Sequence, residues 1–539
     1  RGVDSKERLT LIAGLVILSL FLGVVWVFKY PPLLDYSNHL ARIHIFENLS
    51  DPHFEPYFDF EIGVPTNLAI DGIASFLTLI FPIDVAGRLF ISIVIVLTLF
   101  APVFLSRVLH GRVTAIALLF AVFVFNTAML MGFLNFLFGT ALAIIGFGVH
   151  LLMDKHEIKA WMRVLIGSLI AIAVFMSHVY GFAVYAVCIG SYYLVKLGIR
   201  DFKTLVLNAL QFIPVSLLLA IFVAQSMSTD ITAPNSAFLE AASVPTEVDN
   251  PPLRAIDVEG VEAVDVPLKT AAWEHHVPIR LWMTWKKMSR LWVQYGDHAG
   301  WLGLFCILLG GLYVKNRVWP TTRSLLVPFA VLMALALYLP PVLWGAHHVH
   351  WRFFIPAAMF AAGTFAMPRS DLVTQSSILA GISGLSLLQS GLVYAHFSRA
   401  DAHQQLVIEL FQDIAEGSKV LSIAPSGDPH QLEFPIPFTH MVTLGVIERN
   451  SFVPSMFAYS IQQPLRYRSP YDTFATVPFK KNLNGVDWHK VSGFYDYILI
   501  LDHDGEVGGS ASDWLRRVPI PNAPTGPTNS HIALAEISG

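Results

Sequence analysis

The side chains best suited to chemistry in this 539-residue chain lie in one short polar segment, YPPLLDYSNHLARIHIFENL, residues 30–49. The segment follows directly on an apolar run of membrane-span length, and its pattern predicts an amphipathic helix with Asp35 at its start. A carboxylate at the edge of a membrane can act as a general base that takes a proton from a hydroxyl group, and partial burial would raise its pKa toward a useful range. The alternative is that Asp35 only caps the helix, because the preceding Pro-Pro pair turns the chain there.

The same predicted helix carries two more candidates for substrate binding, His39 and Arg42. Arg42 can bind a phosphate, since a guanidinium matches phosphate oxygens in geometry. It can equally pair with Asp35 or Glu47 in a solvated network.

Two further segments place polar side chains between apolar runs. WGAHHVHWRFF contains Arg352, which can contact a phosphate or reach outward to lipid headgroups. MSHVYGF contains His178 and Tyr180. A histidine between apolar helices is costly unless it is paired, so His178 is a site candidate, while a packing histidine is the simpler alternative. The remaining candidates for binding substrate are His348, His350 and Glu274.

Metal binding finds little support in the sequence. His347, His348 and His350 are not spaced like the ligands of a zinc motif, and a hydrogen-bonding role suits them better. Cys188 and Cys306 lie inside apolar runs, where a small core residue is expected. We therefore expect no metal and no other cofactor.

The composition indicates the elements that must position these groups. Hydrophobic residues make up 54% of the chain and charged residues only 14%, against about 25% charged in soluble domains. The fold class we predict is an α-helical polytopic membrane protein with about eleven transmembrane helices and a small C-terminal α/β domain outside the membrane. The predicted spans lie near 9–29, 88–109, 113–131, 133–153, 163–177, 179–198, 204–225, 299–315, 323–342, 352–368 and 373–397. Segment 69–84 either spans the membrane or lies on its surface.

The basic residues predict the orientation, because Lys and Arg gather in the loops on one side of the predicted bundle. That side is expected to be cytoplasmic and to hold the N-terminus, with the first span retained and the C-terminal domain on the outer, periplasmic or extracellular side. Long outer loops with interfacial helices are expected at 30–87 and 226–298. We divide the chain into a transmembrane domain, 1–399, and an outer α/β domain, 400–539, whose strands are predicted in SKVLSIAP, YDYILILD and HIALAEI.

The order of these parts resembles the GT-C superfamily of membrane glycosyltransferases over roughly residues 9–400. It is most similar to the branch that uses polyprenyl-phosphate sugars, which includes lipid A aminoarabinose transferases and protein O-mannosyltransferases. Asp35 in PPLLDYSNHLAR matches the acidic residue of the family's first outer loop, so the resemblance implies that Asp35 is the general base. HWRFFIPAAMF resembles the Arg-aromatic-Pro opening of a later span, which implies that Arg352 contacts the donor phosphate.

The resemblance also implies a reaction and its partners. The expected reaction is a single inverting displacement, in which a hydroxyl of a lipid, glycan or protein acceptor attacks the sugar of a polyprenyl-phosphate donor. MGFLNF lacks the acidic residues of the metal-dependent oligosaccharyltransferase branch, which again implies no metal. Asp59, Glu61 and Asp71 are candidates for a second carboxylate, but no motif matches them.

Two other function classes are weighed against an enzyme. A transporter of lipid or polysaccharide would be expected to show an internal repeat or charges at the membrane midplane, and the sequence shows neither. A non-catalytic, glycan-binding subunit of an envelope complex is the other alternative, in which Asp35 acts as a cap. The net charge of −4 gives no sign of nucleic-acid binding, so membrane lipids and the lipid-linked sugar are the expected partners.

Overall fold

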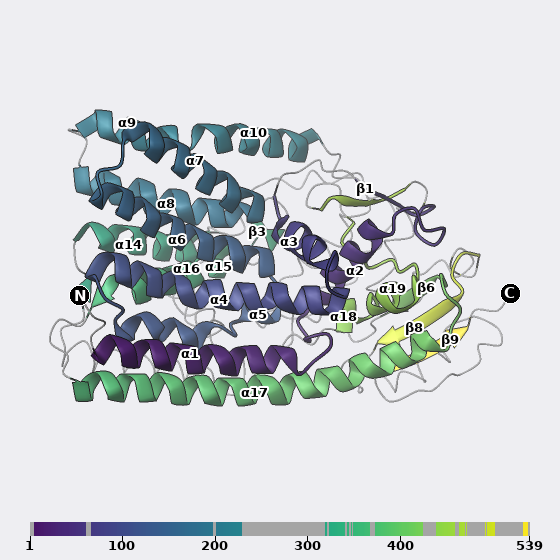
Figure 1. Cartoon of the computed structure of the whole chain (residues 1–539). Coiled ribbons are helices and arrows are strands. Elements are labelled where there is room, and N and C mark those ends of the chain that lie inside the picture. Colours follow the sequence, from purple (N-terminus) through teal and green to yellow (C-terminus); the bar gives the residue numbers. More distant parts are fainter. Residues whose placement is uncertain are drawn as a thin grey trace, which may run out of the picture.

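A computed structural model of the chain shows a mainly helical molecule (Figure 1). The structure describes residues 5–60, 66–197, 201–228, 319–320, 323–339, 342–343, 346–347, 349–366, 372–423, 438–458, 463–468, 471, 491, 493–501 and 532–536. Roughly parallel helices form a bundle, and a smaller layer of short helices and strands covers one end of it (Figure 1). We call this layer the cap.

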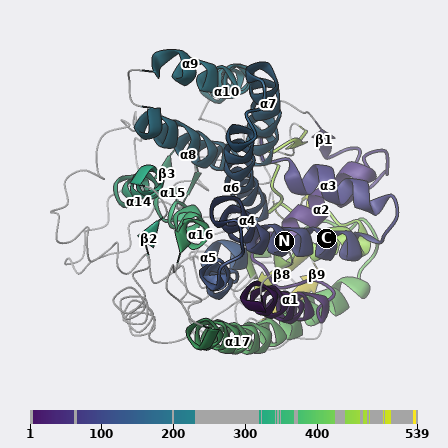
Figure 2. The same ribbon diagram turned by 60° about the vertical axis from the view of Figure 1, so that its left-hand side comes forward.

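Six helices of the described residues are long and apolar enough to cross a membrane. They are α1 (Ser5–Trp26), α4 (Ile83–His110), α6 (Leu134–Lys155), α7 (Ala160–Ser177), α8 (Val179–Leu197) and α17 (Leu372–Gln412). Helices α1 and α17 lie together along one side of the bundle, and α9 (Phe202–Leu210) and α10 (Ile213–Ser228) lie along the opposite side in both views (Figures 1 and 2). The bundle confirms a polytopic helical architecture.

The helix count differs from the eleven predicted spans. Helices α9 and α10 bend by 56° at a short break, and counting them as one span gives seven in the described part of the chain. Three shorter apolar helices are α3 (Ala69–Thr78), α14 (Leu326–Tyr338) and α16 (Phe354–Thr364). The predicted span 299–315 lies outside the described residues.

The predicted span 113–131 is not one α-helix. It forms a 3₁₀ helix, η1 (Ala115–Phe123), followed by the short helix α5 (Thr127–Leu130). Nearly every residue of η1 is buried among α1, α4, α16 and α17. Hydropathy detects such burial but does not distinguish a 3₁₀ helix from an α-helix, which explains the error.

Helix α17 links the bundle to the cap. Its 41 residues would extend about 60 Å at 1.5 Å per residue, well beyond a hydrocarbon core about 30 Å thick. The helix accordingly runs past the end of α1 and reaches the cap strands (Figure 1).

The cap contains a three-stranded sheet in the order β6, β8, β9, made of β6 (Val420–Ile423), β8 (Tyr497–Leu501) and β9 (Ile532–Glu536). Strands β6 and β8 are parallel, whereas β8 and β9 are antiparallel. All three strands form within the segments in which they were predicted, SKVLSIAP, YDYILILD and HIALAEI. The short helices α18 (Phe438–Met441) and α19 (Leu444–Arg449) complete the described cap.

The first outer loop is built into the cap. Strand β1 (Phe58–Phe60) of this loop pairs antiparallel with β7 (Leu465–Tyr467). Lys29 Nζ and the Tyr30 hydroxyl, which follow α1, both donate to the Glu448 carboxylate on α19, at 2.7 and 2.9 Å. Segments separated by about four hundred residues in the sequence therefore form one layer.

Helix α2 (Tyr36–Glu47) is enclosed by this layer, contrary to the predicted amphipathic surface helix. Every residue from Tyr36 to Ile43 is buried, including its polar side chains. The reason is that α18 and α19 cover the polar face of α2, while α4 packs on another side. The sequence of the loop does not reveal that cover.

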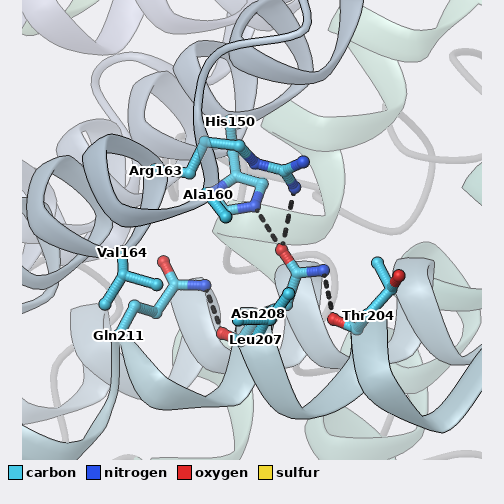
Figure 3. Close-up of a pocket in the computed structure, with 8 residues that line it drawn as sticks. All are labelled: His150, Ala160, Arg163, Val164, Thr204, Leu207, Asn208 and Gln211. Atoms are coloured by element: carbon cyan, nitrogen blue, oxygen red, sulfur yellow. Dashed lines mark hydrogen bonds between the residues drawn. The ribbon is translucent and has the colours of Figure 1, made fainter.

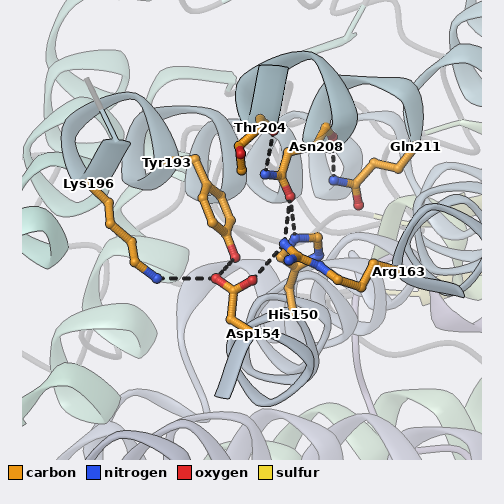
Figure 4. A network of polar contacts seen from close by, with 8 residues as sticks. All are labelled: His150, Asp154, Arg163, Tyr193, Lys196, Thr204, Asn208 and Gln211. Atoms are coloured by element: carbon orange, nitrogen blue, oxygen red, sulfur yellow. Dashed lines mark hydrogen bonds and ion pairs between the residues drawn. The ribbon is translucent and has the colours of Figure 1, made fainter. Parts of the chain in front are cut away.

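A polar cluster at the bundle end far from the cap ties four helices together (Figure 4). The Asp154 carboxylate on α6 accepts from Tyr193 on α8, from Lys196 at 3.2 Å and from Arg163 on α7 at 2.6 Å. Arg163 also donates to Asn208 Oδ1 on α9 at 3.0 Å. Because Asp154 receives two cations and a hydroxyl, the cluster is internally satisfied and fixes these helices side by side.

The bend between α9 and α10 is held beside that cluster by Gln211. Its Nε2 donates to the Asn208 carbonyl at 2.6 Å, and its Oε1 accepts from the Tyr185 hydroxyl at 3.0 Å. A small cavity of about 110 Å³ lies alongside, lined in part by Asn208 and Gln211 (Figure 3). A Cβ at Gly167 on α7 would lie 2.2 Å from Gln211 Oε1, so only glycine leaves room for this side chain.

Candidate active site

The backbone of Asp35 is fixed where the α1–α2 connection meets the turn after α5. Leu34 N–H donates to the Leu130 carbonyl at 2.9 Å, and Asp35 N–H donates to the Met131 carbonyl at 3.2 Å. Gly132 follows in this turn with a φ of +77°, and a Cβ there would lie 2.9 Å from Asp35 N. Glycine is needed for both the left-handed backbone and the close approach.

The Asp35 carboxylate does not serve as a helix cap. Asp35 occupies the N-cap position of α2, but its side chain accepts no capping hydrogen bond. Burial raises the pKa of this carboxyl group to about 7, and the positive charges of Arg352 and Arg42 oppose the rise. A carboxylate that is half ionised near neutral pH suits proton abstraction, so the geometry favours the general-base interpretation over capping.

Arg42 is held by an acidic partner that the sequence did not identify. Its Nε lies 2.7 Å from Asp71 Oδ1 on α3, and its Nη2 lies 2.8 Å from Asp71 Oδ2. The predicted partners are therefore wrong, and Glu47 instead accepts from Thr78. The guanidinium is fully buried, and its Nη1 has no hydrogen-bond partner among the described residues.

His39 lies between Arg42 and the Asp35 turn. Its Nδ1 is 3.1 Å from Arg42 Nη2. Burial, followed by the charge of Arg42 and the nearby His440, holds the pKa of His39 well below its usual range, although a hydrogen bond with the Gly132 backbone opposes this. A neutral His39 accepts from Arg42 and so helps to orient the guanidinium.

Arg352, His178 and Tyr180 come together at the same end of the bundle. The Arg352 guanidinium is buried and lies 4.2 Å from the centroid of the Phe133 ring, with Phe136 and Tyr180 also close. It therefore does not extend outward to headgroups. Stacking of this kind favours arginine over lysine.

His178 presents a proton toward Arg352. The Tyr180 backbone N–H donates to His178 Nδ1 at 3.0 Å. Burial, and then the charge of Arg352, keeps the pKa of His178 well below its usual range. The neutral ring thus carries its proton on Nε2, which lies 3.4 Å from Arg352 Nη1. Two hydrogen-bond donors lie side by side here, an arrangement that an anion beside both of them would stabilise.

His440 on α18 also lies close to Asp35, with its Nε2 3.5 Å from Asp35 Oδ1. Sequence reasoning missed His440 because the stretch around it, EFPIPFTHM, contains no recognisable motif. The role of Asp71 was missed because no periodicity connects it to Arg42.

The other predicted residues do not join this site in the described part of the chain. The α15 backbone (Val349–Arg352) includes His350, but the side chain of His350 lies outside the described residues, as do His348, Glu274 and Glu61. Asp59 pairs instead with Arg468 at 2.7 Å. Among the described residues, no three His, Cys, Asp or Glu side chains are grouped as metal ligands, and the expectation that no metal is needed stays a prediction.

Solved structures provide the comparison for this arrangement. The fold resembles that of ArnT. The structure of ArnT from Cupriavidus metallidurans bound to undecaprenyl phosphate superposes with a TM-score of 0.55 at 10% sequence identity, covering 98% of this chain and 98% of ArnT. The apo structure of the same protein gives 0.54 at 10% identity, covering 97% of each chain. No family model matches the sequence, and no curated protein does. The likeness to ArnT confirms the predicted resemblance at the level of the fold, and it extends over nearly the whole chain.

Proposed function

We propose that this chain is an integral membrane glycosyltransferase that moves a sugar from a polyprenyl-phosphate donor to a hydroxyl group, with inversion at the anomeric carbon. The observation that carries the proposal is the Asp35 carboxylate, which is only 14% exposed and whose pKa burial raises to about 7 against the opposing charges of Arg352 and Arg42. The reaction needs a base that accepts the proton of the acceptor hydroxyl and a cation that stabilises the leaving phosphate, and Asp35 and Arg352 can supply them. The similarity to ArnT, solved with undecaprenyl phosphate, supports a lipid phosphate as part of the substrate.

The phosphate of the donor is assigned to the facing nitrogens of Arg352 and His178. Their separation of 3.4 Å leaves two N–H groups directed toward one region, and a phosphate oxygen can accept from both. Arg42 is the second cation near Asp35. Because Asp71 already neutralises it, we give Arg42 the lesser part in phosphate binding. His39 orients Arg42.

The reaction follows from this placement. Asp35 takes the proton of the acceptor hydroxyl while that oxygen forms a bond to the anomeric carbon. The bond from this carbon to the phosphate oxygen breaks, and its electron pair leaves with the polyprenyl phosphate. Arg352 stabilises the negative charge that develops there, and Asp35 finishes protonated. General-base help of this kind contributes about 10²–10⁴-fold, or about 3–5 kcal/mol of the barrier.

The membrane placement belongs to the same proposal. We place the protein in the inner or plasma membrane with eleven spans, a cytoplasmic N-terminus and the cap on the outer side, and we keep the domain boundary after residue 399. The basic residues Arg107, Arg163 and Lys196 support it, since all three lie in the last turns or first turn of helices at the end far from the cap.

The test is sugar transfer in proteoliposomes. Labelled polyprenyl-phosphate sugars are supplied with a membrane extract as the acceptor, and the parent protein is compared with Asp35→Asn and with Asp59→Asn, an exposed carboxylate outside the site. We expect loss of transfer in Asp35→Asn alone, with binding of undecaprenyl phosphate unchanged. Binding without transfer by the parent protein would favour a transporter or a non-catalytic glycan-binding subunit instead, and a requirement for added metal after chelation would refute the metal-free mechanism.

A further inference from the structure

His440 is held rigidly against the start of α2, close to Asp35. Its side chain is 5% exposed, and its ring packs edge-on to Phe457 with centroids 4.8 Å apart. The Ser37 hydroxyl donates to the His440 carbonyl at 2.9 Å. Contacts hold both the ring and the backbone carbonyl of His440, so the fold restricts the orientation of the ring.

The neighbouring Asn38 determines which ring nitrogen of His440 carries the proton. The Phe457 N–H donates to Asn38 Oδ1 at 2.8 Å, which fixes the orientation of the amide. Asn38 Nδ2 therefore donates, to the Ser455 carbonyl at 2.6 Å and to His440 Nδ1 at 3.1 Å. Since Nδ1 accepts, the neutral ring has its proton on Nε2.

The nitrogen that carries this proton lies near the Asp35 carboxylate. Nε2 lies 3.5 Å from Asp35 Oδ1, which is longer than a good hydrogen bond, but contacts in empty catalytic sites commonly tighten when substrate binds. The ring does not readily accept a proton at Nδ1, because Asn38 already presents an N–H there. His440 is therefore a fixed hydrogen-bond donor and not a relay that removes the proton from Asp35.

We propose that His440 is a positioning residue of the transferase, which holds Oδ1 of Asp35 so that Oδ2 faces the acceptor hydroxyl, and that the cap thereby completes the active site. This inference rests on the proposed function. The other charged or titratable groups that act on Asp35 and His440 are Arg352, Arg42 and His39. Arg352 and Arg42 act on the carboxylate through their charge, whereas His440 Nε2 lies 3.5 Å from Asp35 Oδ1.

The experiment measures the Asp35 carboxyl directly and does not depend on transfer. Infrared difference titration of the full protein follows the carboxyl C=O band that Asp35→Asn removes. His440→Phe keeps the ring against Phe457 but removes the N–H, whereas His440→Gln keeps an N–H at the Nε2 position. We expect the Asp35 midpoint to rise by about one pH unit in His440→Phe, because a hydrogen bond to the charged form is lost, and to stay within half of that shift in His440→Gln.

Transfer is then measured against pH in the same variants. The acidic limb of the rate profile should move upward with the carboxyl midpoint in His440→Phe, so that the rate falls about tenfold below pH 7 and recovers in part at pH 8.5. Thr443→Val is the matched control, because it removes a hydroxyl that donates to the His440 carbonyl at 2.6 Å and leaves the ring donor intact. An unchanged carboxyl midpoint in His440→Phe, or an equal loss of rate at every pH in all three variants, would overturn the inference. Absence of transfer by the parent protein would instead refute the proposed function. The titration would still show whether His440 acts on the Asp35 carboxyl group.

Discussion

Arg42 and Asp71 form a buried, two-pronged ion pair that joins α2 to α3, with N–O distances of 2.7 and 2.8 Å. The arginine side chain is fully buried and the aspartate side chain is 13% exposed. The pair fixes α2, whose N-cap residue is Asp35, against α3. Loss of the Arg42–Asp71 pair should therefore affect both the stability of the fold and the position of Asp35.

Removal of the acidic partner should destabilise the protein strongly. In Asp71→Asn the Arg42 charge stays buried without its counter-charge, and breaking a buried pair from one side costs about 3–5 kcal/mol. The free energy of unfolding in detergent measures the effect. Asp59→Asn is the control, because that carboxylate is 57% exposed and pairs with an exposed arginine, so a loss of no more than about 1 kcal/mol is expected. Equal losses in the two variants would contradict the structural role given to Arg42.

Binding of the lipid phosphate should depend on the shape of the Arg352 side chain and not only on its charge. Arg352→Lys keeps the charge but loses the planar group that stacks on Phe133 at 4.2 Å. We expect binding of undecaprenyl phosphate to weaken by about tenfold, or about 1.4 kcal/mol, in a direct binding assay. Arg107→Lys, which alters an arginine paired with Glu7 at the other end of the bundle, should bind like the parent. Full affinity in both variants would show that Arg352 does not bind the phosphate.

The ionised Asp35 carboxylate should lower the free energy of unfolding at neutral pH. Its folded pKa of about 7 lies above its usual value of 3.8, so folding favours the neutral form and ionisation opposes the fold. The stability advantage of Asp35→Asn over the parent should therefore be small near pH 4, grow as the pH rises to 7 and level off above it, reaching about 1–4 kcal/mol. Unfolding measured at pH 4, 5.5 and 8 tests this. A constant difference across that range would mean that the carboxyl titrates normally.

The pH dependence of the transfer rate should report the ionisation of Asp35. Since only ionised Asp35 accepts the proton, the parent rate is expected to fall about tenfold for each pH unit below about 7. The pH profile of single-turnover transfer is the measurement. A rate that is flat down to pH 5 would show that Asp35 has a carboxyl pKa near its ordinary value, or that another base acts.

Much of this site was predictable from local sequence. Polar side chains beside apolar runs cost free energy when they are buried without a partner, so they mark candidate sites. That rule identified Asp35, Arg352 and His178, which the fold brings to one end of the bundle. It could not identify Asp71 as the partner of Arg42 or His440 as the neighbour of Asp35. Both contacts depend on packing between segments far apart in the chain, for which periodicity and hydropathy carry no information.

The errors in the helix predictions have the same physical reason. The apolar run 113–131 has the composition of a span, yet its burial on all sides allows a 3₁₀ helix. The polar face of α2 suggested exposure to water, but the cap covers it. The strands at Val420 and Tyr497 were predictable because short apolar runs between polar, Pro-rich stretches are a local property of the sequence.

Gly132 should be irreplaceable for a reason that combines strain with contact. Gly132→Ala introduces a side chain at a φ of +77° and places its Cβ 2.9 Å from Asp35 N. The strain alone costs about 1 kcal/mol or more, and relief of the contact must move the backbone that carries Asp35. Gly111→Ala separates the two effects, because Gly111 has a φ of +69° but open space around its Cβ position. We expect similar losses of stability from the two strained positions, but a large loss of transfer, on the order of 10²-fold for an ångström of misplacement, only in Gly132→Ala. Transfer that survives in Gly132→Ala would show that the position of Asp35 tolerates movement, and the close packing of its turn would then serve folding alone.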